Sequence, residues 1–133
     1  MTNMLSSLPE RPLGTKLARR ILVVEDNVDS VHSVVLLLRE MGHQVDFALD
    51  GRAALGLAKA QRPDVVFLDL ALPDISGIEV GRRLRNTSET MHARIVAITG
   101  HADEEMRART KAAGFDLHLV KPIHPRMLEE LLG

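Results

Sequence analysis

Short apolar runs alternate with longer segments of helical spacing along the chain from residue 20 onward. Five runs of four residues, at 21–24, 45–48, 65–68, 95–98 and 117–120, are typical of short strands, and a run that is apolar throughout indicates burial on both faces. Between the first two runs, apolar residues recur every three or four positions, as in Val31, Val35 and Leu38, which is typical of an amphipathic helix.

A few glycine and polar residues set the expected helix boundaries. The first helix ends at Gly42, and Asp50 is the expected N-cap of a second helix that ends before Pro63. Further helices are expected over 78–84, over 103–113 before Gly114, and over 125–132. Five strands that alternate with five helices predict an α/β fold, in which helices flank a doubly wound, five-stranded parallel sheet.

Polar side chains stand where the predicted strands end. Glu25 and Asp26 follow the first strand, Asp69 the third, Thr99 the fourth and Lys121 the fifth. Because ligands bind at the carboxyl ends of the strands in a doubly wound sheet, we expect these five side chains to share one small site.

Three carboxylates in one site repel one another unless cations compensate for them. Lys121 supplies one positive charge, and the oxygen-only ligand set favours Mg²⁺ as the second cation. One carboxylate can then attack phosphorus while the metal and Lys121 neutralise the charge that develops. Thr99 and the backbone N–H groups around Leu70 and Gly100 are candidate hydrogen-bond donors to a transferred phosphoryl group.

Length and composition narrow the possible classes of protein. The 133 residues suffice for one domain, and 17 basic against 18 acidic residues disfavour a surface for nucleic acid. The absence of cysteine excludes disulfides and thiolate chemistry, the scarcity of aromatic residues predicts an aliphatic core, and no apolar run is long enough to span a membrane. Residues 1–19 are expected to form a flexible lead-in to a domain over 20–133, and the expected location is the cytoplasm. Four histidines that lack metal-ligand spacing are expected at the surface: His32, His43, His92 and His124.

Four segments at the predicted strand ends resemble those of a known family. They are Val23–Asn27, Phe67–Leu70 followed by Pro73 and Gly77, Ala97–Gly100, and Leu119–Pro122. In this order they resemble the receiver domains of two-component signalling, over residues 20–132. The resemblance implies a flavodoxin-like, receiver-type fold. It also implies a phosphoryl donor, which would be a phosphohistidine on a sensor histidine kinase or on a histidine phosphotransfer domain.

The resemblance assigns an expected role to each acidic residue of the site. Asp69 corresponds to the phosphoacceptor, and Asp26 to a direct ligand of Mg²⁺, or of Mn²⁺ in its place. Glu25 stands where many relatives have a second Asp, and it is expected to hold the metal through water. Ala71 is expected to contribute its backbone carbonyl to the metal.

Further roles concern the switch and the lifetime of the phosphoryl group. Thr99 and Lys121 match the switch hydroxyl and the phosphate-pairing lysine, and Pro122 is expected to follow a cis peptide bond. His118 stands where the family often has an aromatic switch residue, so it is either a switch side chain or a partly buried packing residue. Ala71 and His101 lie two residues beyond Asp69 and Thr99, at positions where the family tunes the phosphoryl lifetime.

One apolar side chain of the first helix has polar neighbours. Leu36 points away from the core, alongside Asp29 and Glu40. Receivers meet their histidine-bearing partner through this helix, so Leu36 is either a scattered surface residue or part of a docking contact.

Three classes of function remain to be compared. The favoured one is a phosphorylatable switch rather than an enzyme, with limited Mg²⁺-dependent self-phosphorylation and self-dephosphorylation. An aspartate-nucleophile phosphatase would carry a second Asp where this chain has Ala71, and a pseudo-receiver would have lost an acidic residue or the lysine. The short stretch after Pro122 suggests a stand-alone receiver, a relay intermediate or a piece of a hybrid kinase, and the oligomeric state stays open.

Overall fold

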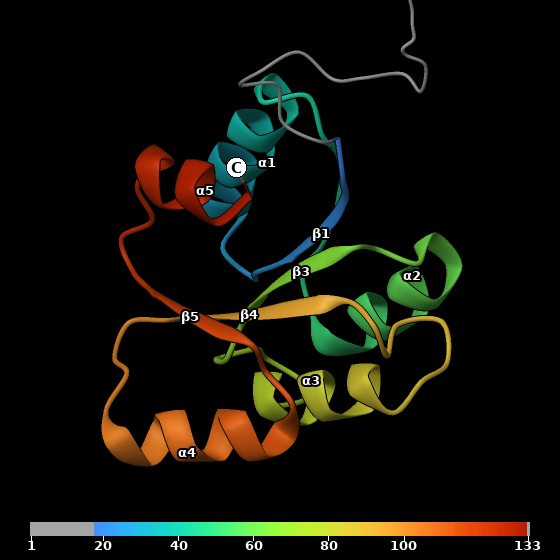
Figure 1. Cartoon of the computed structure of the whole chain (residues 1–133), viewed down its shortest axis with the longest axis vertical. Coiled ribbons are helices and arrows are strands. Elements are labelled where there is room, and N and C mark those ends of the chain that lie inside the picture. Colours follow the sequence, from blue (N-terminus) through green and yellow to red (C-terminus); the bar gives the residue numbers. More distant parts are fainter. Residues whose placement is uncertain (1–17, 133) are drawn as a thin grey trace, which may run out of the picture.

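The computed structural model describes residues 18–132 as strands and helices in strict alternation (Figure 1). The strands are β1 (Arg20–Val24), β2 (Gln44–Ala48), β3 (Val65–Asp69), β4 (Arg94–Thr99) and β5 (Leu117–Val120). The helices are α1 (Val28–Glu40), α2 (Gly51–Gln61), α3 (Gly77–Arg85), α4 (Glu104–Ala113) and α5 (Pro125–Leu132). The predicted lead-in lies outside the described residues except for Ala18 and Arg19, and the Arg19 carbonyl already accepts the Gln44 N–H at 2.9 Å.

The five strands form one parallel sheet in the order β2-β1-β3-β4-β5. Helices α1 and α5 lie on one face of this sheet, and α2, α3 and α4 lie on the other (Figure 1). The doubly wound fold expected from the sequence is therefore confirmed. The chain order reverses between β1 and β3, and a ligand crevice forms outside the carboxyl ends of strands at such a point.

The sheet separates two buried clusters of side chains. On one face, Val31 and Leu38 of α1 and Leu128 of α5 pack against the sheet. On the other face the packing residues come from α2, α3 and α4, and they include Ala54 and Val80. The core is aliphatic as expected, apart from two buried phenylalanines, Phe67 and Phe115.

Capping residues explain where the helices begin and end. The Asn27 side chain accepts the Ser30 N–H at 2.9 Å, so α1 begins three residues before the first core valine, Val31. Asp50 caps α2 as expected, and α4 is followed by Gly114, whose φ of 98° is readily adopted by glycine.

One histidine is placed differently from the prediction. His43 is buried, with 5% of its surface exposed, because its Nδ1 accepts the Arg19 N–H at 3.0 Å beside the start of β1. Sequence spacing alone gave no sign of this contact, which joins residues 24 positions apart.

Candidate functional site

Three carboxylates meet at the carboxyl end of the sheet. Glu25 and Asp26 follow β1, and Asp69 ends the neighbouring strand β3. One carboxylate oxygen from each of the three lies within 4.8 Å of the others. Glu25 and Asp69 are 5% and 4% exposed, whereas Asp26 is exposed. Buried carboxylates this close together need a cation to offset their repulsion.

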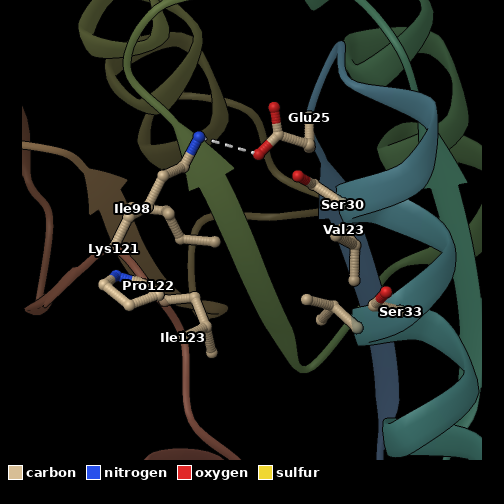
Figure 2. Close-up of a pocket in the computed structure, with 9 residues that line it drawn as sticks. Val23, Glu25, Ser30, Ser33, Ile98, Lys121, Pro122 and Ile123 are labelled. Atoms are coloured by element: carbon tan, nitrogen blue, oxygen red, sulfur yellow. Dashed lines mark ion pairs between the residues drawn. The ribbon is translucent and has the colours of Figure 1, made fainter.

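Lys121 supplies a positive charge from the segment that follows β5. Its Nζ lies 2.7 Å from Asp69 Oδ2 and 3.0 Å from Glu25 Oε1, and Figure 2 shows the second of these ion pairs. The Lys121 N–H donates to the Thr99 carbonyl at 2.9 Å, which fixes the residue beside the end of β4. The Lys121–Pro122 peptide bond is cis, as expected.

Burial and neighbouring charges shift the pKa values of Glu25 and Lys121. Burial raises the pKa of Glu25 and the charge of Asp69 adds to this, while Lys121 and the Asn27 N–H act in the opposite direction. Burial acts to lower the pKa of Lys121, but its contacts with Asp69 and Glu25 raise that pKa above its usual value. Lys121 therefore stays an ammonium ion, and three carboxylates beside one ammonium form an oxygen-rich site that suits a divalent cation such as Mg²⁺.

The backbone after Asp69 turns back onto the carboxylate. The Ala71 N–H donates to Asp69 Oδ1 at 2.8 Å, in a turn that aspartate favours. Among the N–H groups around Leu70 that were expected as donors, the one of Leu70 itself donates to the Ile98 carbonyl at 3.1 Å, so the neighbouring Ala71 N–H is the one that reaches the site. Leu70 continues the pairing of β3 with β4, so the first N–H group that can reach the Asp69 carboxylate belongs to Ala71.

Two residues hold this loop in place. A Cβ added to Gly77 would lie 2.3 Å from the Asp69 carbonyl oxygen, so α3 begins in direct contact with the backbone that carries Asp69. The Asp74 carboxylate accepts the N–H groups of Gly51 at 2.8 Å and Arg52 at 2.9 Å, which ties the loop to α2. Burial acts to raise the pKa of Asp74, but these N–H groups lower it to about 2.

Thr99 lies at the end of β4 but does not contact the carboxylates. Its hydroxyl donates to the His101 carbonyl at 2.8 Å and accepts the His101 N–H at 3.2 Å. The His101 side chain is 81% exposed, and its Nε2 lies 3.3 Å from Asp103 Oδ2. The structure thus brings four of the five predicted side chains together and holds the fifth, Thr99, in its own turn.

Two other predicted residues lie away from the acidic cluster. His118 of β5 is partly buried, and its Nε2 lies 2.6 Å from Thr110 Oγ1 of α4. Leu36 is 63% exposed on α1 and points away from the core, as expected.

A groove of about 440 Å³ opens beside the cluster, between α1 and the segment after β5 (Figure 2). Glu25 and Lys121 lie at one end of it, and the sequence pattern did not reveal it. The other residues that line it are Val23, Ser30, Ser33, Val34, Ile98, Pro122 and Ile123.

Comparison with known proteins agrees with this geometry. The family model of the response regulator receiver domain matches residues 21–133. The polar-differentiation response regulator DivK of Brucella anthropi is 31% identical over 114 residues, which cover 85% of this chain and 93% of DivK.

Solved structures show the same fold. The chemotaxis protein CheY4 of Vibrio cholerae superposes with a TM-score of 0.83 at 31% identity, over 87% of this chain and 97% of CheY4. The receiver domain of the sensor histidine kinase PA1611 of Pseudomonas aeruginosa gives 0.79 at 30% identity, over 87% and 95% of the two chains. That receiver was crystallised with a magnesium ion coordinated in its active site cleft. Among residues 18–132, no helix has the length and apolar character needed to cross a bilayer.

Proposed function

This chain belongs to the family of response regulator receiver domains, and on that premise we propose that Asp69 accepts a phosphoryl group from a phosphohistidine. The observation that carries the proposal is the pair of donors around the Asp69 carboxylate. Lys121 Nζ donates to Oδ2, and the Ala71 N–H donates to Oδ1. A carboxylate oxygen of Asp69 attacks phosphorus, the bond from phosphorus to the imidazole nitrogen breaks, and the imidazole leaves with the electron pair.

We propose that the acidic cluster holds Mg²⁺, or Mn²⁺ in its place. Asp26 and Asp69 would be direct ligands, and Ala71 would offer its backbone carbonyl. Glu25 is already paired with Lys121 at 3.0 Å, which fits a contact with the metal through water. When bound, the ion would neutralise negative charge on the phosphoryl oxygens.

Three groups of this chain would bind the phosphoryl oxygens. Lys121 and the Ala71 N–H already contact Asp69. Thr99 would join them by giving up its contacts with the His101 backbone, and this movement would allow His118 to turn inward. The exposed His101 side chain and the small Ala71 side chain would set how easily water reaches the aspartyl phosphate.

The groove beside Lys121 is the proposed meeting place with the donor, a sensor histidine kinase or a histidine phosphotransfer domain. A histidine-bearing helix laid along Ser33 and Ile123 would bring its imidazole toward the end of the groove where Lys121 lies. Leu36, which is exposed on α1 one turn beyond Ser33, would extend this contact. The cytoplasmic location expected from the sequence is part of the proposal.

The pseudo-receiver alternative is less favoured, because the three carboxylates of Glu25, Asp26 and Asp69 gather within 4.8 Å and Lys121 pairs with two of them. The deciding experiment treats the full chain with acetyl phosphate and Mg²⁺ and measures its intact mass. A single phosphoryl adduct is expected, and it should disappear with EDTA and in Asp69→Asn but persist in the control Asp29→Asn. The absence of any adduct, with acetyl phosphate and with a phosphorylated histidine partner, would favour the pseudo-receiver.

A second experiment tests docking separately from chemistry. Leu36→Asp should slow phosphotransfer from a histidine partner about tenfold, the effect of removing one good apolar contact from an interface. The same variant should react with acetyl phosphate at the wild-type rate, because that small donor needs no docking surface. An unchanged rate from the protein donor would remove Leu36 from the docking contact.

A further inference from the structure

Helix α4 packs against the rest of the protein through few buried side chains. Thr110 and Ala113 are its only buried residues, and Met106 is partly buried. Thr110 has no exposed surface although it carries a hydroxyl group. A buried hydroxyl needs a hydrogen-bond partner, so the partner of Thr110 decides how the middle of α4 is held.

The partner outside α4 is His118 of the edge strand β5. His118 Nε2 lies 2.6 Å from Thr110 Oγ1, and the same hydroxyl lies 3.1 Å from the Arg107 carbonyl. The hydroxyl has one proton, which it can donate to only one of these groups. Both contacts are satisfied when the O–H donates to the Arg107 carbonyl and His118 donates its Nε2–H to the hydroxyl oxygen.

The strand register places His118 on the same face of the sheet as Thr99. His118 is paired with Ala97, and Thr99 is paired with Val120. Side chains two residues apart on a strand share a face, so Ala97 and Thr99 lie on the face that carries His118. The neighbour of His118 in β4 is thus a small side chain, and a turn of the ring away from α4 directs it over Ala97 toward Thr99.

We propose that Thr110 is a positioning residue whose hydroxyl holds His118 against α4 and thereby stabilises the unphosphorylated arrangement of α4 and β5. The inward turn of His118 breaks this hydrogen bond, so the bond opposes switching. The link to switching rests on the proposed function of Asp69. A net hydrogen bond of ordinary strength changes a two-state population about fivefold.

The first test reads the bond itself and needs no phosphorylation. Long-range ¹H–¹⁵N spectra of the full chain should show His118 as a fixed Nε2–H tautomer. In Thr110→Val, which keeps the branched shape but lacks the hydroxyl, the ring should lose this fixed tautomer, and Thr110→Ser should restore it. An unchanged tautomer in Thr110→Val would overturn the proposal, as would a serine variant that behaves like the valine variant.

The second test reads the coupling to the site. Beryllofluoride with Mg²⁺ is a phosphoryl mimic, and Thr110→Val should bind it about fivefold more tightly than wild type because the opposing bond is gone. In a His118→Phe background, Thr110→Val should have no further effect. Equal affinity in Thr110→Val and wild type would overturn the link to switching. If wild type bound no beryllofluoride, the function proposed for Asp69 would fail with that link, and the tautomer data alone would decide the role of Thr110.

Discussion

Strands β3 and β5 both deliver a residue to the acidic site, yet their surroundings differ. All five residues of β3 are buried, and its last residue, Asp69, touches the start of α3 through Gly77. None of the four residues of β5 is fully buried, and the strand lies at the edge of the sheet. The helix next to it in the chain, α4, buries only Thr110 and Ala113.

This difference in burial separates a tightly packed part, β3 and the start of α3, from a loosely packed part, β5 and α4. Asp69 is the proposed nucleophile and as such needs a fixed position, which the packing of an interior strand provides. A response to phosphorylation needs an element with two arrangements of similar free energy, and loosely fastened elements meet that need. Both kinds of element border the acidic site. Asp69 ends the buried strand β3, and Lys121, which contacts Asp69, follows the less buried strand β5.

The largest loss of unfolding free energy should follow from a substitution in the tightly packed part, at Gly77. Gly77→Ala places a methyl group against the Asp69 backbone, with no flexible side chain to move aside, and should cost about 3 kcal/mol of unfolding free energy. Gly56→Ala is the matched control, since nothing lies within 4 Å of its added Cβ. The control should be stabilised by up to about 1 kcal/mol. Urea unfolding measures both variants, and similar effects in the two would contradict the close contact at Gly77.

A smaller loss of unfolding free energy should follow from a substitution in the loosely packed part, at Arg85. This side chain donates to the Gly114 carbonyl at 2.7 Å, to the Ala93 carbonyl at 2.8 Å and to Asp116 at 2.8 Å, so it fixes the far end of α4. Arg85→Ala should cost about 2 kcal/mol of unfolding free energy, because partly buried carbonyl groups lose their donor.

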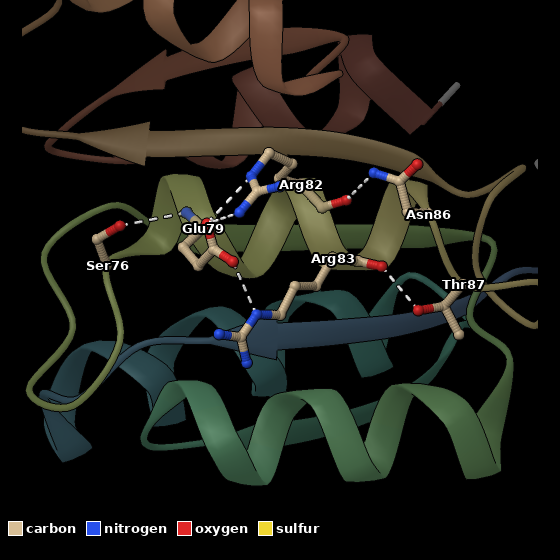
Figure 3. Close-up of polar contacts among 6 residues, drawn as sticks. All are labelled: Ser76, Glu79, Arg82, Arg83, Asn86 and Thr87. Atoms are coloured by element: carbon tan, nitrogen blue, oxygen red, sulfur yellow. Dashed lines mark hydrogen bonds and ion pairs between the residues drawn. The ribbon is translucent and has the colours of Figure 1, made fainter.

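Arg82 on the same helix provides the matched control for Arg85. It is 58% exposed and pairs with Glu79, which also pairs with Arg83 (Figure 3). Arg82→Ala should change the unfolding free energy by less than about 0.5 kcal/mol. Should Arg82→Ala cost as much as Arg85→Ala, α4 would not owe its attachment to the Arg85 contacts.

The smallest change in stability should appear on acidification, through the protonation of Asp74. Its pKa of about 2 in the folded protein is lower than the usual value of 3.8, so its contribution to stability is present above that value. This contribution should be lost as the pH falls from about 4 to about 2. The difference in stability between wild type and Asp74→Asn, from denaturant unfolding at several pH values, should shrink over this range. A constant difference would show that the charge of Asp74 does not hold the loop to α2.

The sequence predicts most of the sheet and the acidic cluster for a simple reason. Buried parallel strands are apolar throughout, and the topology brings their carboxyl ends together whatever the side chains do. Glu25, Asp69 and Lys121 could therefore be assigned to one site from their places in the chain alone, and the structure brings them into contact.

Contacts between distant backbone and side-chain atoms could not be predicted in this way. The donor to Asp69 is the Ala71 N–H and not that of Leu70, because the register with β4 uses the Leu70 group. The burial of His43 and the bond from His118 to Thr110 depend on side-chain rotamers, which a periodic pattern does not encode.

The sheet divides the core into two clusters that share no helix. Helix α1, the proposed docking element, packs into one cluster, and α4, the proposed responding element, lies over the other. Substitutions far apart and without shared partners act nearly additively. If α1 selects the donor and α4 carries the response, as proposed, substitutions on one side of the sheet can change the donor while the other side keeps its response.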